Sequence, residues 1–154
     1  MQDRYLFRGK SEYGWSYGNL HVCGTTNNHH IIGCAECDEQ VEINLVYNNV
    51  VEVNSYTIGQ CTGLRDKNGA LIFEGDILSM DNKYHPNKGY ECKILIVYDK
   101  NGFCYRYPIK KDLRYTPNIT TDTTFHIFTY DISKYAEIIG NIHDNPELLE
   151  SEAE

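Results

Sequence analysis

The chain has 154 residues, of which 41% are hydrophobic and 23% charged, so its composition is that of a folded globular domain and excludes a disordered one. Its net charge of −8 disfavours a general affinity for nucleic acid, because such affinity comes largely from neutralising phosphates. No apolar run approaches the roughly 20 residues of a membrane-spanning helix, and the charged N-terminal segment lacks the apolar core of an export signal. We therefore expect a cytoplasmic protein with no membrane partner, whose six Cys are thiols or metal ligands.

Most predicted elements are β-strands, because apolar and polar residues alternate along the chain. The first expected hairpin covers residues 41–53 and turns at Asn48 and Asn49, which tolerate positive φ. A second hairpin joins apolar faces at 94–98 and 103–107. Further strands are expected at 77–80, 125–130 and 135–142.

The end of the chain predicts a short helix. Asn145 precedes Pro146, and this pair is typical of a helix start. The helix is followed by an acidic tail at 151–154. Short strands separated by turns favour one mainly β domain over residues 1–150, a small, barrel-like, antiparallel fold built from hairpins; an α+β fold is the alternative.

The tetrapeptide Asp-Lys-Asn-Gly occurs at 66–69 and again at 99–102. Asp can accept hydrogen bonds from the turn that follows it, and Asn-Gly tolerates positive φ, so both copies predict tight turns. The first copy lies in the dense stretch GQCTGLRDKNGALIFEGD. Its acids, Asp66, Glu74 and Asp76, invite a second hypothesis, a cation site or acid–base work shared with His143. Each acid sits in a turn beside glycine, which favours the structural interpretation, and we expect no enzyme.

Three segments resemble the YopX-like family of phage and prophage proteins. They are FRGKSEYGWSYGNL near the N-terminus, TIGQCTGLRDKNGALIFEGDIL in the centre and YAEIIGNIHDNPELL near the C-terminus. The resemblance implies a mainly β, barrel-like protein of a bacterial host cell and transfers no catalytic residue. Its motif positions here are Gly59, Gln60, Thr62, Gly63, Asp66, Gly69, Glu74, Gly75, Asp76, Gly140 and Asn141.

A possible zinc site lies outside these segments. His21 and Cys23 would share one face of an extended strand, and Cys34 and Cys37 form a CxxC pair, with His29 and His30 between the two pairs. Four such ligands suit tetrahedral zinc. The favoured alternative is reduced thiols with no cofactor. The other cysteines are in strand-like contexts and are expected in the core: Cys61, Cys92 and Cys104.

The segment 83–114 is basic in an acidic chain, with eight positive side chains against three acids. Basic groups that follow phosphates, with rings that stack on bases, are how β-barrels bind single strands. The candidate nucleic-acid surface is Lys93, Arg106, Lys110, Lys111 and Arg114. The accompanying aromatics are Tyr84, Tyr90, Tyr98, Phe103, Tyr105 and Tyr107, which alternation equally predicts to be core.

Two classes of function follow. An acidic β-protein with 13 Tyr suits a non-enzymatic binding module that contacts a host or phage protein, because Tyr is favoured at protein interfaces. The alternative is a single-stranded nucleic-acid-binding module that uses the hairpin at 93–114. Exposed strand edges would also permit a homo-oligomer.

Overall fold

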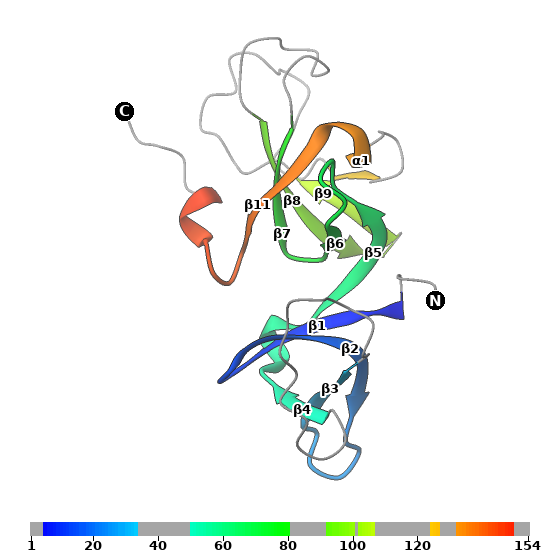
Figure 1. The fold of residues 1–154 in the computed structure, drawn as a ribbon. Helices are drawn as coiled ribbons and strands as arrows, with labels where there is room; N and C mark the ends of the chain where they lie inside the picture. Colours follow the sequence, from blue (N-terminus) through cyan, green and yellow to red (C-terminus); the bar gives the residue numbers. More distant parts are fainter. Residues whose placement is uncertain are drawn as a thin grey trace. The chain divides into compact units, whose positions relative to one another are not determined.

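The computed structural model describes residues 5–33, 50–80, 92–100, 102–106, 124–126 and 132–149 (Figure 1). Its contacts divide the chain into two compact units, residues 1–63 and 64–154, which are described separately. The expectation of a single domain over 1–150 stays a prediction. Among the described helices, none has the length and apolar character needed to cross a membrane.

The first unit is an antiparallel sheet in the order β4-β3-β2-β1-β5. Alternating apolar residues and the tight turn between β1 and β2 build this sheet from short strands. Its elements are β1 (Phe7–Ser11), β2 (Gly14–Val22), β3 (His29–Gly33), β4 (Val50–Val53), the 3-10 turn η2 (Ser55–Thr57) and β5 (Gly59–Arg65). β5 begins beside β1 and continues into the second unit, where it pairs with β6.

The chain after β4 returns to β1 and curls the sheet. The Asn54 amide donates to the Lys10 carbonyl at 2.9 Å, and the Lys10 amide donates to the Thr57 hydroxyl at 2.8 Å. Among its described residues, the buried hydrophobic side chains of this unit are Leu6, Ile31, Val53 and Cys61. Gly9 makes the close approach possible, since a Cβ there would lie 2.7 Å from the Val53 Cγ2 atom.

The second unit is a five-stranded antiparallel sheet in the order β10-β9-β8-β7-β11. Its elements are β6 (Leu71–Phe73), β7 (Asp76–Met80), β8 (Cys92–Asp99), β9 (Gly102–Arg106), β10 (Thr124–His126), α1 (Ile132–Tyr135), β11 (Ala136–Asn141) and the 3-10 turn η6 (Pro146–Leu149). A single apolar cluster fills its core: Ile72, Leu78, Met80, Ile94, Ile96, Phe103, Tyr105 and Ala136.

The mainly β prediction is confirmed, with one difference in shape. The described strands form two open sheets. The first and last strands of each sheet do not pair with each other, so neither sheet closes into a barrel. The hairpin predicted at 94–107 is present, with Tyr98 paired to Phe103 and Asp99 to Gly102. The C-terminal helix is a 3-10 turn that starts at Pro146 as expected and ends at Leu149. Of the hairpin predicted at 41–53, only β4 lies within the described residues.

The contact between Gly9 and Val53 predicts a coupled pair of substitutions. Gly9→Ala should lower the free energy of unfolding by roughly 1–3 kcal/mol, because the added methyl overpacks the curl against Val53. Adding Val53→Ala should recover part of that loss, so the double variant is less destabilised than the sum of the single variants. Urea denaturation measures all three. If the losses in the free energy of unfolding are additive, the contact with Val53 is not the reason why position 9 requires glycine.

Candidate functional site

Asp66 organises the first Asp-Lys-Asn-Gly turn and fixes it to a distant strand. One carboxylate oxygen accepts the amides of Asn68 and Ala70, both at 2.9 Å, and Gly69 closes the turn with a φ of 89°. The other oxygen accepts the Ile138 amide at 3.1 Å. Asp66 is only 5% exposed, so this carboxylate exchanges water for three backbone donors.

The next residue strengthens the same junction. The Lys67 amide donates to the Ala136 carbonyl at 2.9 Å, and the Lys67 ammonium pairs with the Glu137 carboxylate. Hydrogen bonding and charge from Lys67 lower the pKa of Glu137. Because β11 is the last strand of its sheet, the turn satisfies backbone groups that an edge strand otherwise leaves to water.

The Glu74-Gly75-Asp76 corner is built in a similar way. The Asp76 carboxylate, 1% exposed, accepts the Phe73 amide at 2.8 Å. Gly75 has a φ of 84°; its amide donates to the Ile96 carbonyl and its carbonyl accepts the Ile142 amide, each at 2.9 Å. The corner therefore joins β8 to the end of β11.

The C-terminal motif residues complete this arrangement. Gly140 lies against the η6 turn, since a Cβ there would lie 2.5 Å from the Asn145 Oδ1 atom. The Asn141 side-chain oxygen accepts the amides of His143 and Asp144, each at 3.0 Å. Asp66 and Asp76 thus accept hydrogen bonds from the backbone of their own turns, as the structural interpretation of this stretch predicts, and Asp66 in addition accepts the distant Ile138 amide.

The zinc hypothesis stays a prediction, because Cys34 and Cys37 lie outside the described residues. His21 is exposed in β2, and Cys23 follows the strand as a half-buried thiol. Within the described ranges, no three His, Cys, Asp or Glu side chains are grouped to hold a metal ion.

Cys23 differs from the two described core cysteines in its environment. The Thr26 hydroxyl, followed by the backbone amides of Thr26 and Thr25, donates to the Cys23 sulfur and lowers its pKa. Cys61 and Cys104 are buried, as predicted, while the Cys92 side chain lies outside the described part. Burial first, and then the neighbouring Asp99, raises the pKa of Cys104.

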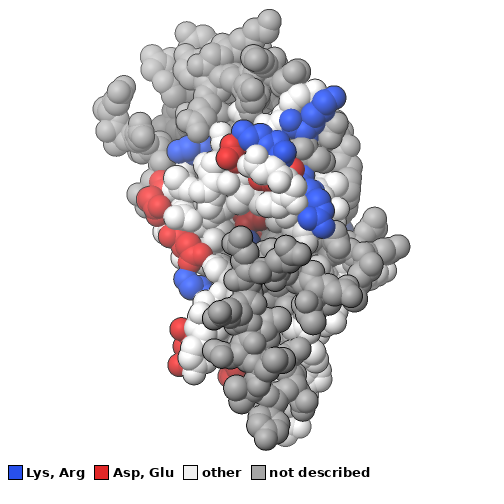
Figure 2. Space-filling model, viewed as in Figure 1, with Lys and Arg blue, Asp and Glu red and all other residues white. Residues whose placement is uncertain are grey.

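The nucleic-acid hypothesis also stays a prediction. Phe103 and Tyr105 lie in the core, so neither ring is available for stacking, whereas Tyr98 is exposed and meets the Phe103 ring edge-on at 5.0 Å between centroids. Arg106 is exposed and Lys93 is half-buried. Three basic residues lie outside the described ranges: Lys110, Lys111 and Arg114. On the face drawn in Figure 2, Lys and Arg side chains lie beside acidic ones.

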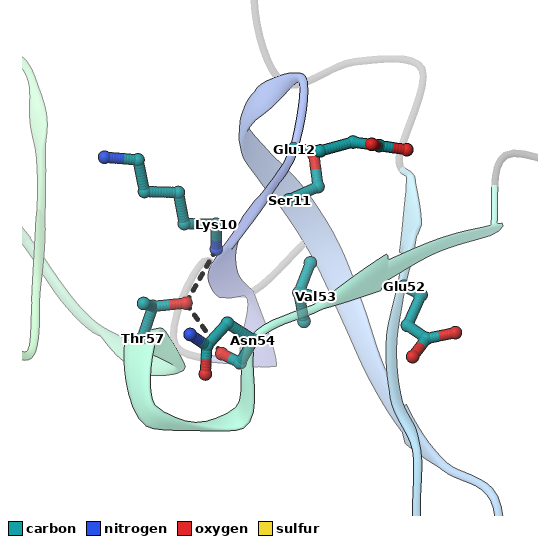
Figure 3. Close-up of a pocket in the computed structure, with 7 residues that line it drawn as sticks. All are labelled: Lys10, Ser11, Glu12, Glu52, Val53, Asn54 and Thr57. Atoms are coloured by element: carbon teal, nitrogen blue, oxygen red, sulfur yellow. Dashed lines mark hydrogen bonds between the residues drawn. The ribbon is translucent and has the colours of Figure 1, made fainter.

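Sequence reasoning did not find a hollow of about 570 Å³ in the first unit (Figure 3). The end of β1 contributes Lys10, Ser11 and Glu12 to it. The end of β4 and the following turn contribute Glu52, Val53, Asn54 and Thr57. These segments lie about forty residues apart in the sequence and meet because the chain after β4 returns to β1, so no local motif marks the site.

Two residues that line this hollow have a tyrosine as their neighbour in the sequence. Tyr13 follows Glu12 and Tyr56 precedes Thr57, and each is 89% exposed. The Glu12 carboxylate, by hydrogen bonding and then by its charge, raises the pKa of the Tyr13 hydroxyl, which places the two side chains in contact. The signal that the sequence carries for this site is the presence of Tyr beside two of its residues, because Tyr is common at binding surfaces. The structure adds that both tyrosines are exposed.

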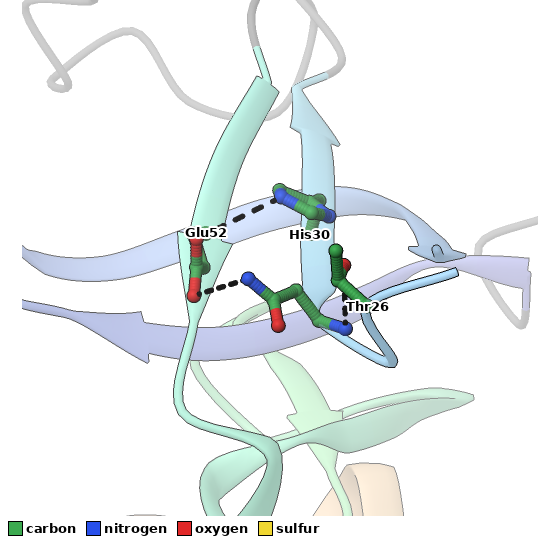
Figure 4. Close-up of polar contacts among 4 residues, drawn as sticks. Thr26, His30 and Glu52 are labelled. Carbon is green, nitrogen blue, oxygen red and sulfur yellow. Dashed lines mark hydrogen bonds and ion pairs between the residues drawn. The ribbon is translucent and has the colours of Figure 1, made fainter. Parts of the chain in front are cut away.

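Glu52 also belongs to a polar row across three strands, of which Figure 4 shows His30 and Glu52. His21 in β2 pairs with His30 in β3, and His30 pairs with Glu52 in β4. The two imidazole centroids are 6.3 Å apart, and the His30 Nε2 atom lies 4.0 Å from the Glu52 carboxylate. The Asn28 side-chain amide donates to the other Glu52 oxygen at 3.0 Å.

Comparison with known proteins identifies the family. The family model described as YopX protein matches residues 6–150. The chain belongs to the YopX family. Its structure is similar to the crystal structure of protein EF1440 from Enterococcus faecalis, with 25% sequence identity, a TM-score of 0.47 and coverage of 94% of this chain and 96% of that one. No curated protein matches it.

YopX membership confirms the resemblance drawn from the three segments, since the match includes all of the motif positions. In this YopX protein the described hydrogen bonds of Asp66, Gly75 and Asp76 connect strands and turns of the second unit, whereas Gly59 and Gln60 pair with β1 in the first. The hollow lies in the first unit, where the motif contributes only the start of β5.

The Asp66 contacts predict a large effect of an isosteric change. Asp66→Asn should lower the free energy of unfolding by about 1–3 kcal/mol, because an amide nitrogen then faces a buried backbone donor. Asp99→Asn is the matched control, since Asp99 opens the second copy of the same tetrapeptide and is less buried. Chemical denaturation of both variants is the measurement. Equal losses would contradict a special role for the junction between Asp66 and Ile138.

The Cys23 environment predicts a reactive thiol. Because the pKa of Cys23 is lowered, a larger fraction of this thiol is ionised near neutral pH than in an ordinary cysteine. Cys23 should therefore be alkylated by iodoacetamide faster than Cys61 and Cys104. Thr26→Val should slow the reaction near neutral pH and shift its pH profile upward. Thr25→Val is the control, because it keeps the amide that faces the sulfur. Peptide mapping by mass spectrometry reports each site, and an unchanged profile in Thr26→Val would rule out the hydroxyl as the cause.

Proposed function

We propose that this YopX protein is a non-enzymatic binding module of phage or prophage origin that contacts a host or phage protein through its first unit. One observation carries the proposal. Of the seven large hydrophobic side chains exposed among the described residues, six belong to the first unit: Tyr5, Tyr13, Val22, Ile32, Val50 and Tyr56. The seventh, Tyr98, belongs to the second.

The exposed tyrosines suit protein contacts. A Tyr ring offers a large apolar surface with few rotatable bonds, and its hydroxyl makes a directed hydrogen bond. Such residues dominate the binding energy of many interfaces when they enter a partner's pocket. Tyr13 and Tyr56 are carried by tight turns, and the Asn54 side chain accepts the Tyr56 amide at 3.0 Å, which holds that turn in shape.

A second apolar element lies on the outer face of the same sheet. Ile32 in β3 and Val50 in β4 are cross-strand partners, and both are exposed. They lie two residues from His30 and Glu52 along their strands, so apolar and polar groups adjoin on this face. A surface of mixed character is typical of interfaces between proteins that also exist separately.

Site-specific crosslinking tests the proposal. A photoreactive phenylalanine analogue replaces Tyr13 or Tyr56 in the full chain, which is expressed in its bacterial host with phage genes present. We expect a discrete crosslinked protein at both positions, and little at the matched control position, Tyr98. Mass spectrometry identifies the product. Tyr13→Ser and Tyr56→Ser together should weaken the purified complex by roughly tenfold or more, as expected for interface tyrosines.

The outcomes separate the alternatives. A crosslinked product made only of this chain would replace the proposal with a homo-oligomer that uses the same surface. Background labelling at Tyr13 and Tyr56, or equal labelling at Tyr98, would overturn it.

A further inference from the structure

We infer that the hollow of the first unit receives an arginine side chain of the protein partner, with Glu12 and Glu52 as its acidic side. This inference rests on the proposed function and adds the chemistry that the partner must present.

Among the described residues of the first unit, the accessible charged side chains line the hollow. These described residues include four Lys, Arg, Asp or Glu side chains, namely Arg8, Lys10, Glu12 and Glu52. Arg8 is buried and faces the Trp15 ring at 4.8 Å, whereas the other three line the hollow. Figure 3 shows Glu12 and Glu52 on one side and the Lys10 side chain extending away from them. That side is therefore complementary to a cation.

Glu52 is held in place before any partner arrives. The Asn28 amide binds one carboxylate oxygen at 3.0 Å, and His30 lies 4.0 Å from the other. The Glu52 side chain is nevertheless 64% exposed, so it keeps acceptor positions open to a ligand. A carboxylate fixed in this way loses little conformational freedom on binding.

The remaining walls suit the stem and the planar head of arginine. Val53 is apolar and Thr57 is nearly buried, and hydrogen bonds from Asn54 to Lys10 and from Lys10 to Thr57 hold this wall rigid. The methylene stem can lie along such a surface while the guanidinium reaches a carboxylate. A guanidinium also offers a planar fork of donors that matches a carboxylate through two parallel hydrogen bonds, which favours arginine over lysine beside two glutamates.

A peptide titration tests the inference directly. The probe is acetyl-Gly-Arg-Gly-amide, added to the ¹⁵N-labelled full chain and followed by two-dimensional NMR. We expect saturable shifts of the Glu12, Glu52 and Thr57 amides. The isosteric citrulline peptide, which lacks the charge, should give none of comparable size.

Charge-removing variants complete the test. Glu12→Gln and Glu52→Gln should each weaken binding by roughly threefold, and by about tenfold together, the scale of partly exposed ion pairs. Glutamine at position 52 keeps the oxygen that accepts the Asn28 bond, so the fold is preserved. Glu147→Gln, an exposed change in the second unit, should leave the affinity unchanged.

The two proposals fail in different ways. Equal shifts with the citrulline peptide, shifts centred elsewhere, or full affinity in the double variant would overturn the arginine site. A crosslinked partner lost in the tyrosine variants but retained in Glu12→Gln/Glu52→Gln would leave the binding function standing and remove the arginine. Selective arginine binding without any crosslinked partner would leave the arginine site standing and remove the proposed binding function.

Discussion

The Asp66 carboxylate joins two parts of the second unit that are 72 residues apart in the sequence. It accepts two amides of its own turn and one from β11, and the neighbouring Lys67 amide bonds the same strand. Three donors around a nearly buried carboxylate compensate for the water it loses. This junction holds the turn against the edge of the sheet, and the Gly75 corner bonds Ile96 and Ile142 in the same unit.

A different constraint shapes the first unit. The chain after β4 has to come back to β1, and it does so through the backbone bonds of Lys10 with Asn54 and Thr57. Only glycine at position 9 leaves room for Val53 beneath that return. The curl leaves a hollow, and three charged side chains of the described residues line it, namely Lys10, Glu12 and Glu52.

Under the proposed function, the two units divide structure and recognition between them. The second unit contains the larger apolar core and most of the family motif, whose described bonds are internal. Among the described residues, the first unit carries most of the exposed large hydrophobic side chains, and it also contains the hollow. A family signature need not mark a binding surface, because glycines and buried acids that hold turns are as constrained chemically as ligands are.

The sequence by itself determined the strand content, the two Asp-Lys-Asn-Gly turns and membership of the YopX family, since period-two alternation and turn chemistry are local properties. It also favoured a structural role for Asp66 and Asp76, because each acid adjoins a glycine turn. It did not reveal that Asp66 reaches Ile138, that the sheets stay open, or that Glu12 and Glu52 line one hollow. Those features were decided by the tertiary structure, because they depend on strand order and on how far the first sheet curls, and side chains forty or more residues apart meet only once both are fixed.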